Sequence, residues 1–263
     1  MAALLSGIVC GIVGAYIVAR RRVFLSGGIT HASFGGIGIA YHFGLDPVLG
    51  AAVFAVLSSL GIEWWTLKGR MREDSAIGMA WSFGMAVGII FVFLTPGYAP
   101  NLMTFLFGNI LTVTGRDLVA LGLLVALLLV AGPFFFRSVA YAAFDGDFAR
   151  SRGVPVAAVS YVMAVVVALA IVLCIRSVGI VLLISLLTVP AAIANSMTER
   201  LGRIMLYAAV VAVAGNLAGL YFSYAMNVPA GAVTIFLLAF ALVFVKLLNL
   251  CFRKRSLHSE NPR

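Results

Sequence analysis

Long apolar segments, separated by short polar stretches, make up most of this chain. The apolar residues are continuous rather than alternating, and most segments are about 18–22 residues long, the length of an α-helix that crosses a bilayer. Alternation would instead favour the strands of a membrane barrel. The pattern therefore predicts helices over about residues 3–20, 30–44, 47–67, 75–95, 116–136, 157–175, 178–197, 203–225 and 230–250.

Two stretches do not fit a spanning helix. Residues 102–113 are apolar but too short to cross a bilayer, which is typical of a re-entrant or broken segment. Residues 137–156 form a longer polar connection between two spans. We expect one transmembrane domain over residues 1–252, followed by a basic cytoplasmic tail at 253–263, with no soluble domain at either end.

The composition agrees with a protein whose solvent is lipid. Hydrophobic residues make up 63% of the chain and charged residues 10%, and the mean hydropathy is +1.13. A soluble domain carries about 25% charged residues. In lipid the backbone can form all its hydrogen bonds only in helices or a closed barrel. Since the pattern does not alternate, we expect an all-α polytopic integral membrane protein with about 8–9 transmembrane helices.

The net charge of +9 comes from short basic clusters between the apolar runs, which is how the positive-inside bias appears in a sequence. Nucleic acid is therefore not an expected partner. Placing the clusters in the cytoplasm gives nine passes with the N-terminus outside and the C-terminus inside, and leaves Arg176 alone on the outer side. Eight passes remain an alternative, since one of the first two helices can be short or re-entrant.

Three glycine pairs have the small-xxx-small spacing that lets helix backbones approach closely. They are Gly7 with Gly11, Gly84 with Gly88, and Gly215 with Gly219. The spacing predicts tight helix packing and no particular function.

The sequence lacks the motifs of several enzyme classes. No lysine precedes Ser or Thr in a Walker A motif, and neither an HExxH nor a GxSxG motif is present. We therefore expect no catalytic residue and no permanently bound cofactor. If ATP drives this protein, a separate subunit must bind it.

The few polar residues at membrane depth are the candidates for function, because ionisable groups there are costly. His31 and His42 are eleven residues apart, which returns to the same face of a helix, and imidazole binds zinc and other first-row metals. Asn109 is a further candidate. Asp46 either belongs to the same path or caps the helix that begins at Pro47.

Glu63 is a separate case. It precedes Trp64-Trp65, a pair typical of the membrane interface, so a solvated acid at the interface is the simpler interpretation for it.

The connection over about 141–156 contains signals for the start and the end of a short helix. Asp145 suits a helix N-cap, Gly153 the residue after a helix, and Pro155 a stop beyond it. The short helix between them carries Phe148 and Arg150, an apolar anchor with a charged neighbour. It is either a docking element for a soluble partner or an ordinary loop.

Seven motifs, in order along nearly the whole chain, resemble the zinc/manganese class of bacterial ABC importer permeases. They are Arg20-Arg21 after the first helix, Thr30-His31-Ala32-Ser33 with Gly35-Gly36, Glu73-Asp74 with Ile77-Gly78, Leu106-Phe107-Gly108-Asn109, Asp145 and Phe148-Ala149 with Gly153-Val154, Val178-Gly179 through Thr188-Val189-Pro190-Ala191-Ala192, and Pro229-Ala230-Gly231.

The resemblance implies a homodimeric permease of the bacterial cytoplasmic (inner) membrane that works by alternating access. It implies a separate ABC ATPase dimer on the segment with Asp145, Phe148, Arg150 and Gly153, and an extracytoplasmic metal-binding protein. The transported ion would be zinc or manganese, with iron as a third candidate.

His31 falls on the family's metal-path histidine. The family often has an aspartate four residues earlier, where this chain has Gly27. Asp46, His42 or Asn109 are the residues that could compensate.

Two other functions stay open at this point. A permease for a metal chelate, of the metallophore or cobalamin kind, would have the same architecture and a wide apolar path. An ion-coupled secondary carrier would need no ATPase. An intramembrane enzyme is a third alternative, disfavoured by the missing catalytic motifs.

Overall fold

The structure is a computed structural model, and it describes residues 1–96, 108 and 113–259, with the side chains of 251–259 left out. Every regular element in that part of the chain is a helix, as the hydropathy pattern predicts. The helices are α1 (Ala2–Ala19), α2 (Val23–His42), α3 (Pro47–Leu67), α4 (Glu73–Leu94), α6 (Gly115–Phe144), α7 (Gly146–Ser151), α8 (Val156–Val178), α9 (Ile180–Asn195), α10 (Leu201–Met226) and α11 (Ala230–Ser259).

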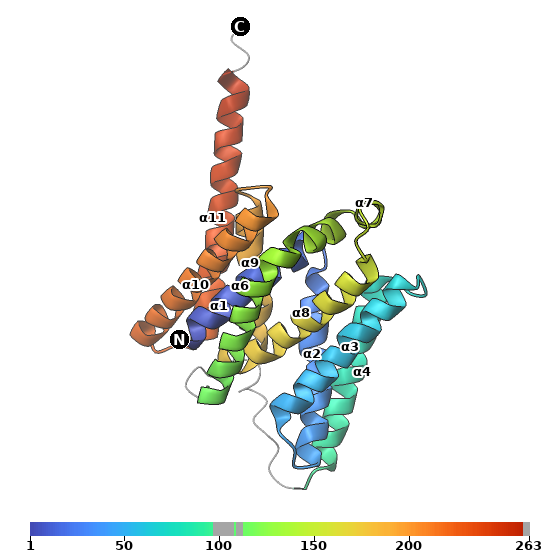
Figure 1. Ribbon diagram of the computed structural model, residues 1–263. Helices are drawn as coiled ribbons and strands as arrows, with labels where there is room; N and C mark the ends of the chain where they lie inside the picture. Colours follow the sequence, from blue (N-terminus) through green and yellow to red (C-terminus); the bar gives the residue numbers. More distant parts are fainter. Residues whose placement is uncertain (97–107, 109–112, 260–263) are drawn as a thin grey trace.

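Eight of these helices are long and apolar enough to cross a membrane, and α9, with 16 residues, is a shorter apolar helix. The loops with the basic clusters lie at one end of the tilted bundle, along the upper and right-hand side of Figure 1. We call it the cytoplasmic end, following the positive-inside bias. The predicted re-entrant segment, 102–113, lies outside the described residues apart from Gly108 and Val113.

Three predicted boundaries were wrong. The second helix begins at Val23 rather than near residue 30, because Gly27 and Gly28 are helical residues that do not break the helix, and Gly28 packs directly on Ile77 of α4. Helix α6 continues through Pro133 to Phe144, so most of the first half of the predicted polar connection 137–156 is helical. Helix α11 runs on to Ser259, through much of the predicted tail.

Local chemistry sets several helix ends. Thr114 and Asp117 form a reciprocal capping box at the start of α6. Helices α8 and α9 are separated only by Gly179, whose φ of +79° is available to glycine at little cost. The backbone of Gly108 lies directly against Gly179, so a side chain on Gly108 would not fit.

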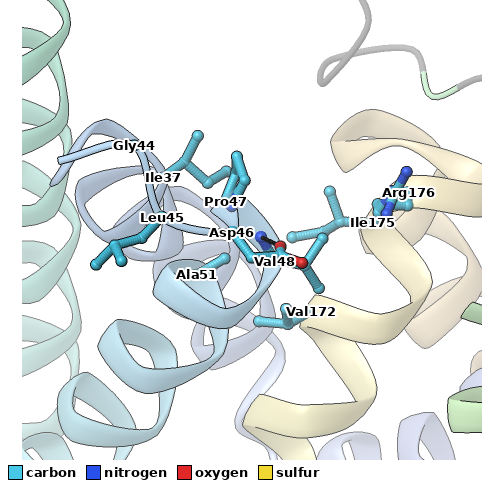
Figure 2. A pocket seen from close by; sticks show the side chains of 10 residues that line it. All are labelled: Ile37, Gly44, Leu45, Asp46, Pro47, Val48, Ala51, Val172, Ile175 and Arg176. Atoms are coloured by element: carbon cyan, nitrogen blue, oxygen red, sulfur yellow. Dashed lines mark hydrogen bonds between the residues drawn. The ribbon is translucent and has the colours of Figure 1, made fainter. Parts of the chain in front are cut away.

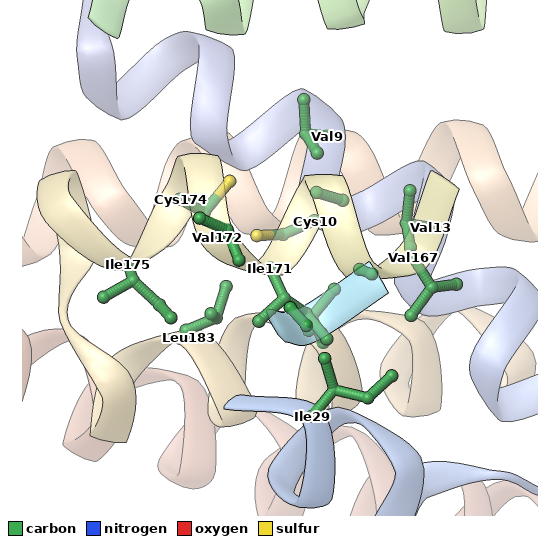
Figure 3. Packing of buried hydrophobic residues seen from close by; sticks show 14 of the residues in the cluster. Val9, Cys10, Val13, Ile29, Val167, Ile171, Val172, Cys174, Ile175 and Leu183 are labelled. Atoms are coloured by element: carbon green, nitrogen blue, oxygen red, sulfur yellow. The ribbon is translucent and has the colours of Figure 1, made fainter. Parts of the chain in front are cut away.

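The helices form two groups joined through α8. Helix α2 packs closely on α3 and α4, while α1 packs on α9 and α10, and α10 on α11. Helix α8 contacts α3, α6 and α1 between the two groups. The core lies where α1, α2, α8 and α9 meet, and Figure 3 shows Cys10, Ile29, Ile171 and Leu183 among its buried side chains.

All three glycine pairs predicted from spacing make close helix contacts. Gly7 and Gly11 lie against Val213 and Ala209 of α10, so a side chain there would collide with backbone. The pair in α4 faces Ala32 and Phe34 of α2, and the pair in α10 faces Leu238 and Thr234 of α11. Tight packing through glycine is therefore confirmed at three separate interfaces.

A buried network of charges ties the cytoplasmic ends of three helices together. Arg22, between α1 and α2, binds Glu63 of α3 (Nη1–Oε2 2.6 Å) and Glu73 of α4 (Nε–Oε1 2.8 Å). Burial alone would lower the pKa of Arg22, but the two carboxylates outweigh it and raise that pKa. Arg20 donates to the hydroxyls of Tyr16 and Ser160, which brings in α8.

The interpretation of Glu63 as a solvated interfacial acid was wrong. Glu63 is only 2% exposed, because the helix turns it towards Arg22 while the neighbouring Trp64 faces outward. A buried carboxylate needs a paired cation, and the arginine cluster after α1 supplies it.

Replacing Glu63 by alanine should destabilise the protein strongly, since Arg22 would lose its fully buried partner and keep only the half-buried Glu73. Removing one partner of a buried ion pair costs about 3–5 kcal/mol of unfolding free energy. The measurement is thermal unfolding of the detergent-solubilised protein. Asp74→Ala, which removes an exposed acid next to Glu73, is the control and should change the unfolding free energy by less than about 0.5 kcal/mol. Equal losses in the two variants would contradict a structural role for the pair.

Candidate functional site

His31 lies on α2 with its ring stacked on Trp81 of α4. The two ring centroids are 4.4 Å apart and the planes are almost parallel, at 4°. Stacking fixes the plane of the imidazole, and both ring nitrogens are without a hydrogen-bond partner in the described chain.

His42 lies three turns along α2 and also faces α4. Its Nδ1 is 3.1 Å from the hydroxyl of Thr95, and that hydroxyl donates its single proton to the carbonyl of Phe91 at 2.7 Å. The Thr95 oxygen can therefore only accept from His42, so Nδ1 carries the imidazole proton. The lone pair is then on Nε2, which is the atom available to a metal ion.

The two histidines share one helix face, as their spacing predicts. Both rings contact α4, His31 through Trp81 and His42 through Phe91. At a rise of 1.5 Å per residue they are about 16 Å apart along the helix, too far to bind one ion together. They can serve only as successive contacts along a path.

Asp46 is a helix cap in this structure. Its side chain accepts from the backbone N–H of Val48 at 2.7 Å, with Pro47 as the first residue of α3. It lines a cavity of about 470 Å³ on the outer side, shown in Figure 2, between the α2–α3 connection and the end of α8.

Across that cavity lies Arg176, the cation predicted to stand alone outside. Its Nη1 is 3.1 Å from Oδ1 of Asp117 in α6, so the arginine is paired with an acid. A paired arginine on the outer side is compatible with placing the basic clusters in the cytoplasm. The cavity thus has an acid on one wall and a neutralised arginine on the other.

The structure does not bring the predicted metal-path residues into one cluster. Within the described ranges, no three His, Cys, Asp or Glu side chains are grouped so that they could hold a metal ion. Asn109 lies outside the described residues. The assignment of His31, His42, Asp46 and Asn109 to an ion path therefore stays a prediction.

Sequence reasoning missed Trp81. Its role depends on the packing of α4 against α2, and nothing in its local sequence marks it. Gly27 lies near the same place, and a side chain on it would make only ordinary contacts, 3.8 Å from Ile184 and 3.9 Å from Trp81. A Cβ at position 27 therefore fits beside Trp81 without displacing a neighbour.

The predicted short helix over the 141–156 connection is α7, and both of its ends are capped. The Asp145 carboxylate accepts from the N–H groups of Asp147 (2.9 Å) and Phe148 (3.0 Å). At the other end, Gly153 has a φ of +76°, and Gly153 and Val154 donate back to the carbonyls of Arg150 and Ala149. These two bonds define a Schellman motif.

Ala149, and not Phe148, is the residue that holds α7 on the rest of the protein. Ala149 is fully buried against Ala142 and Val156, at the ends of α6 and α8. Phe148 is 42% exposed, with Tyr141 edge-on at 5.4 Å and the Arg152 guanidinium at 5.3 Å from its ring. An aromatic ring held in place yet open to solvent is suited to contact with a partner.

A groove of about 660 Å³ lies beside this ring. Its walls come from the end of α6, from α7 and from the start of α10. The lining residues are Phe136, Ala140, Tyr141, Phe144, Asp145, Phe148, Arg200, Leu201, Gly202 and Arg203. The cytoplasmic end thus offers an apolar hollow with basic groups at one side.

The model of the ABC 3 transport family matches residues 1–249. A manganese transport system membrane protein, MntC of Halalkalibacterium halodurans, is 34% identical over 248 residues, covering 92% of this chain and 84% of the relative. Among solved structures, PsaBC from Streptococcus pneumoniae in complex with Fab has a TM-score of 0.81 at 30% identity and covers 93% and 88% of the two chains.

An inward-facing metal-chelate type ABC transporter has a TM-score of 0.65 at 14% identity, and covers 92% of this chain and 84% of the other. That likeness concerns the fold alone.

Replacing Asp145 by alanine should loosen α7, because the first turn loses the acceptor of two N–H groups. The loss of an N-cap costs about 1 kcal/mol. Amide hydrogen exchange should therefore become faster at Asp147 and Phe148. Asp147→Ala removes only an exposed ion pair with Arg150 and should have a smaller effect. Identical exchange in the two variants would show that the cap does not hold the helix.

Proposed function

The chain belongs to the ABC 3 transport family, and on that basis we propose that it is the membrane permease subunit of an ATP-driven importer of divalent transition-metal ions, manganese or zinc. Transport proceeds by alternating access, in which two halves of a dimer expose a central path to one side of the membrane and then the other. The observation that carries the proposal is the likeness, over 92% of this chain, to a protein named for manganese transport.

The metal path in this proposal runs past α2. His31 offers ring nitrogens without hydrogen-bond partners in the described chain, and His42 offers Nε2. An ion in transit must be bound weakly at each step, and single histidine contacts from each protomer suit that better than a closed four-ligand site.

Gly27 bears on which metal is carried. Imidazole suits zinc, whereas carboxylate and water suit manganese. The family's aspartate is absent at this position, so His31 is left without a hard ligand one turn away. We propose that this protein handles zinc at least as well as manganese for that reason.

The ATPase in this proposal is a separate subunit that binds at α7. The support is the capped helix, the exposed ring of Phe148 and the adjoining groove, all at the end that carries the basic clusters. A homodimer and an extracytoplasmic metal-binding protein complete the assembly. The named relatives favour a metal ion over a chelate, and they favour an ATP-driven importer over an ion-coupled carrier.

Uptake of radiolabelled zinc and manganese into proteoliposomes tests the proposal. The vesicles contain the permease and its ATPase, with ATP inside and the metal-binding protein outside. His31→Ala should lower ATP-dependent uptake about tenfold or more, within the range seen when metal sites are altered. Phe148→Ala should lower uptake and also abolish the stimulation of ATP hydrolysis by the metal-binding protein.

Matched variants separate these roles from general damage. His258→Ala removes a histidine from the C-terminal tail, and Phe93→Ala removes an exposed phenylalanine from the outer end of α4. Both should transport normally. Full uptake by His31→Ala would remove the path assignment, and no ATP-dependent uptake of either metal by wild type would overturn the metal permease.

Gly27→Asp should raise the ratio of manganese to zinc uptake, because it adds a carboxylate one turn from His31, at a position where a Cβ makes only ordinary contacts. The measurement is the same uptake assay with both labels present. Gly27→Asn has the same size without the charge and should leave the ratio unchanged. If the two variants gave the same ratio, position 27 would not select the metal.

A further inference from the structure

The cytoplasmic end of α3 carries an aromatic ring with two cations beside it. Lys68 Nζ lies 4.7 Å from the ring centroid of Trp64, and Arg70 Cζ lies 5.4 Å from it. Gly69, with a φ of +61°, makes the turn that brings both cations back over the same indole. We call Trp64, Lys68 and Arg70 the Trp64 platform.

The cations of the platform have no acidic partner within the described part of the chain. Arg22 occupies Glu63 and Glu73. Asp74, the remaining acid near the turn, forms no ion pair with Lys68 or Arg70. Arg72 adds a third exposed cation. A cation above an exposed aromatic ring gains only a weak attraction, so the two like charges remain close together without a counter-ion. An anion at this point would relieve their repulsion.

The platform stands at the end of an apolar stripe. Leu49, Val53 and Leu57 are exposed on α3 at intervals of four residues, and Trp64 continues the same face two turns later. Lys68 follows one turn beyond Trp64. The face that meets acyl chains therefore ends in an indole, which prefers the level of the lipid headgroups, and then in unpaired cations.

We propose that the Trp64 platform is a binding site for an anionic phospholipid of the cytoplasmic leaflet. The lipid phosphate lies between Lys68 and Arg70, and an acyl chain runs along the stripe of Leu57 and Val53. The charged headgroup of the lipid thus meets the two cations, and its acyl chain meets the apolar residues that precede them on α3. The site depends on the membrane location of the chain and not on which ion it carries.

Native mass spectrometry of the purified full-length protein tests this site, with phosphatidylglycerol and phosphatidylcholine added separately. Wild type should retain phosphatidylglycerol in preference. The double variant Lys68→Gln/Arg70→Gln should bind it about 25-fold more weakly, because each basic residue near an anionic surface contributes roughly fivefold. Phosphatidylcholine binding should be the same in both proteins.

The control variant, Arg116→Gln/Lys246→Gln, removes the same charge from two other exposed positions and should keep the preference. Retained preference in the platform variant, or equal binding of the two lipids by wild type, would overturn the proposal. So would inorganic phosphate that displaces the lipid at equal concentration, since the acyl chain would then add nothing. If the platform variant lost ATPase binding while lipid binding was unchanged, the surface would be a protein contact instead.

Discussion

Close contact between helix backbones is the constraint on which the packing of this protein depends. Lipid offers no hydrophobic gain when two apolar helices meet, so the contact itself must supply the attraction. Glycine pairs meet this need at α1–α10, α2–α4 and α10–α11. The contact between α2 and α4 also has a functional side, because it brings Trp81 against His31 and Phe91 against His42.

The sequence predicted the parts of this fold that follow from one helix at a time. The bounds of α3 were predicted to the residue, since Asp46 and Pro47 mark its start and a basic turn follows its end. The two caps of α7 were also predicted, because Asp145 and Gly153 act on their own neighbours. The start of α2 was missed because glycines there serve packing and not chain reversal.

The sequence could not predict which side chains meet between different helices. Arg22 meets Glu63 across 41 positions, and Arg176 meets Asp117 across 59, so neither pairing leaves a local signal. The same holds for Trp81 and His31. For the candidate site, the shared face of the two histidines was predictable from helical period, whereas the freedom of the His31 nitrogens depends on which neighbouring helix covers the ring.

The caps of α7 have a mechanical consequence. An isolated two-turn helix frays in water, so a force on its middle would unwind it instead of moving it as a whole. Here the first turn is tied to Asp145 and the last is closed at Gly153, while Ala149 wedges the middle against the ends of α6 and α8. A helix held in this way would move as one rigid piece. A displacement at Phe148 would therefore shift the adjoining ends of α6 and α8 together.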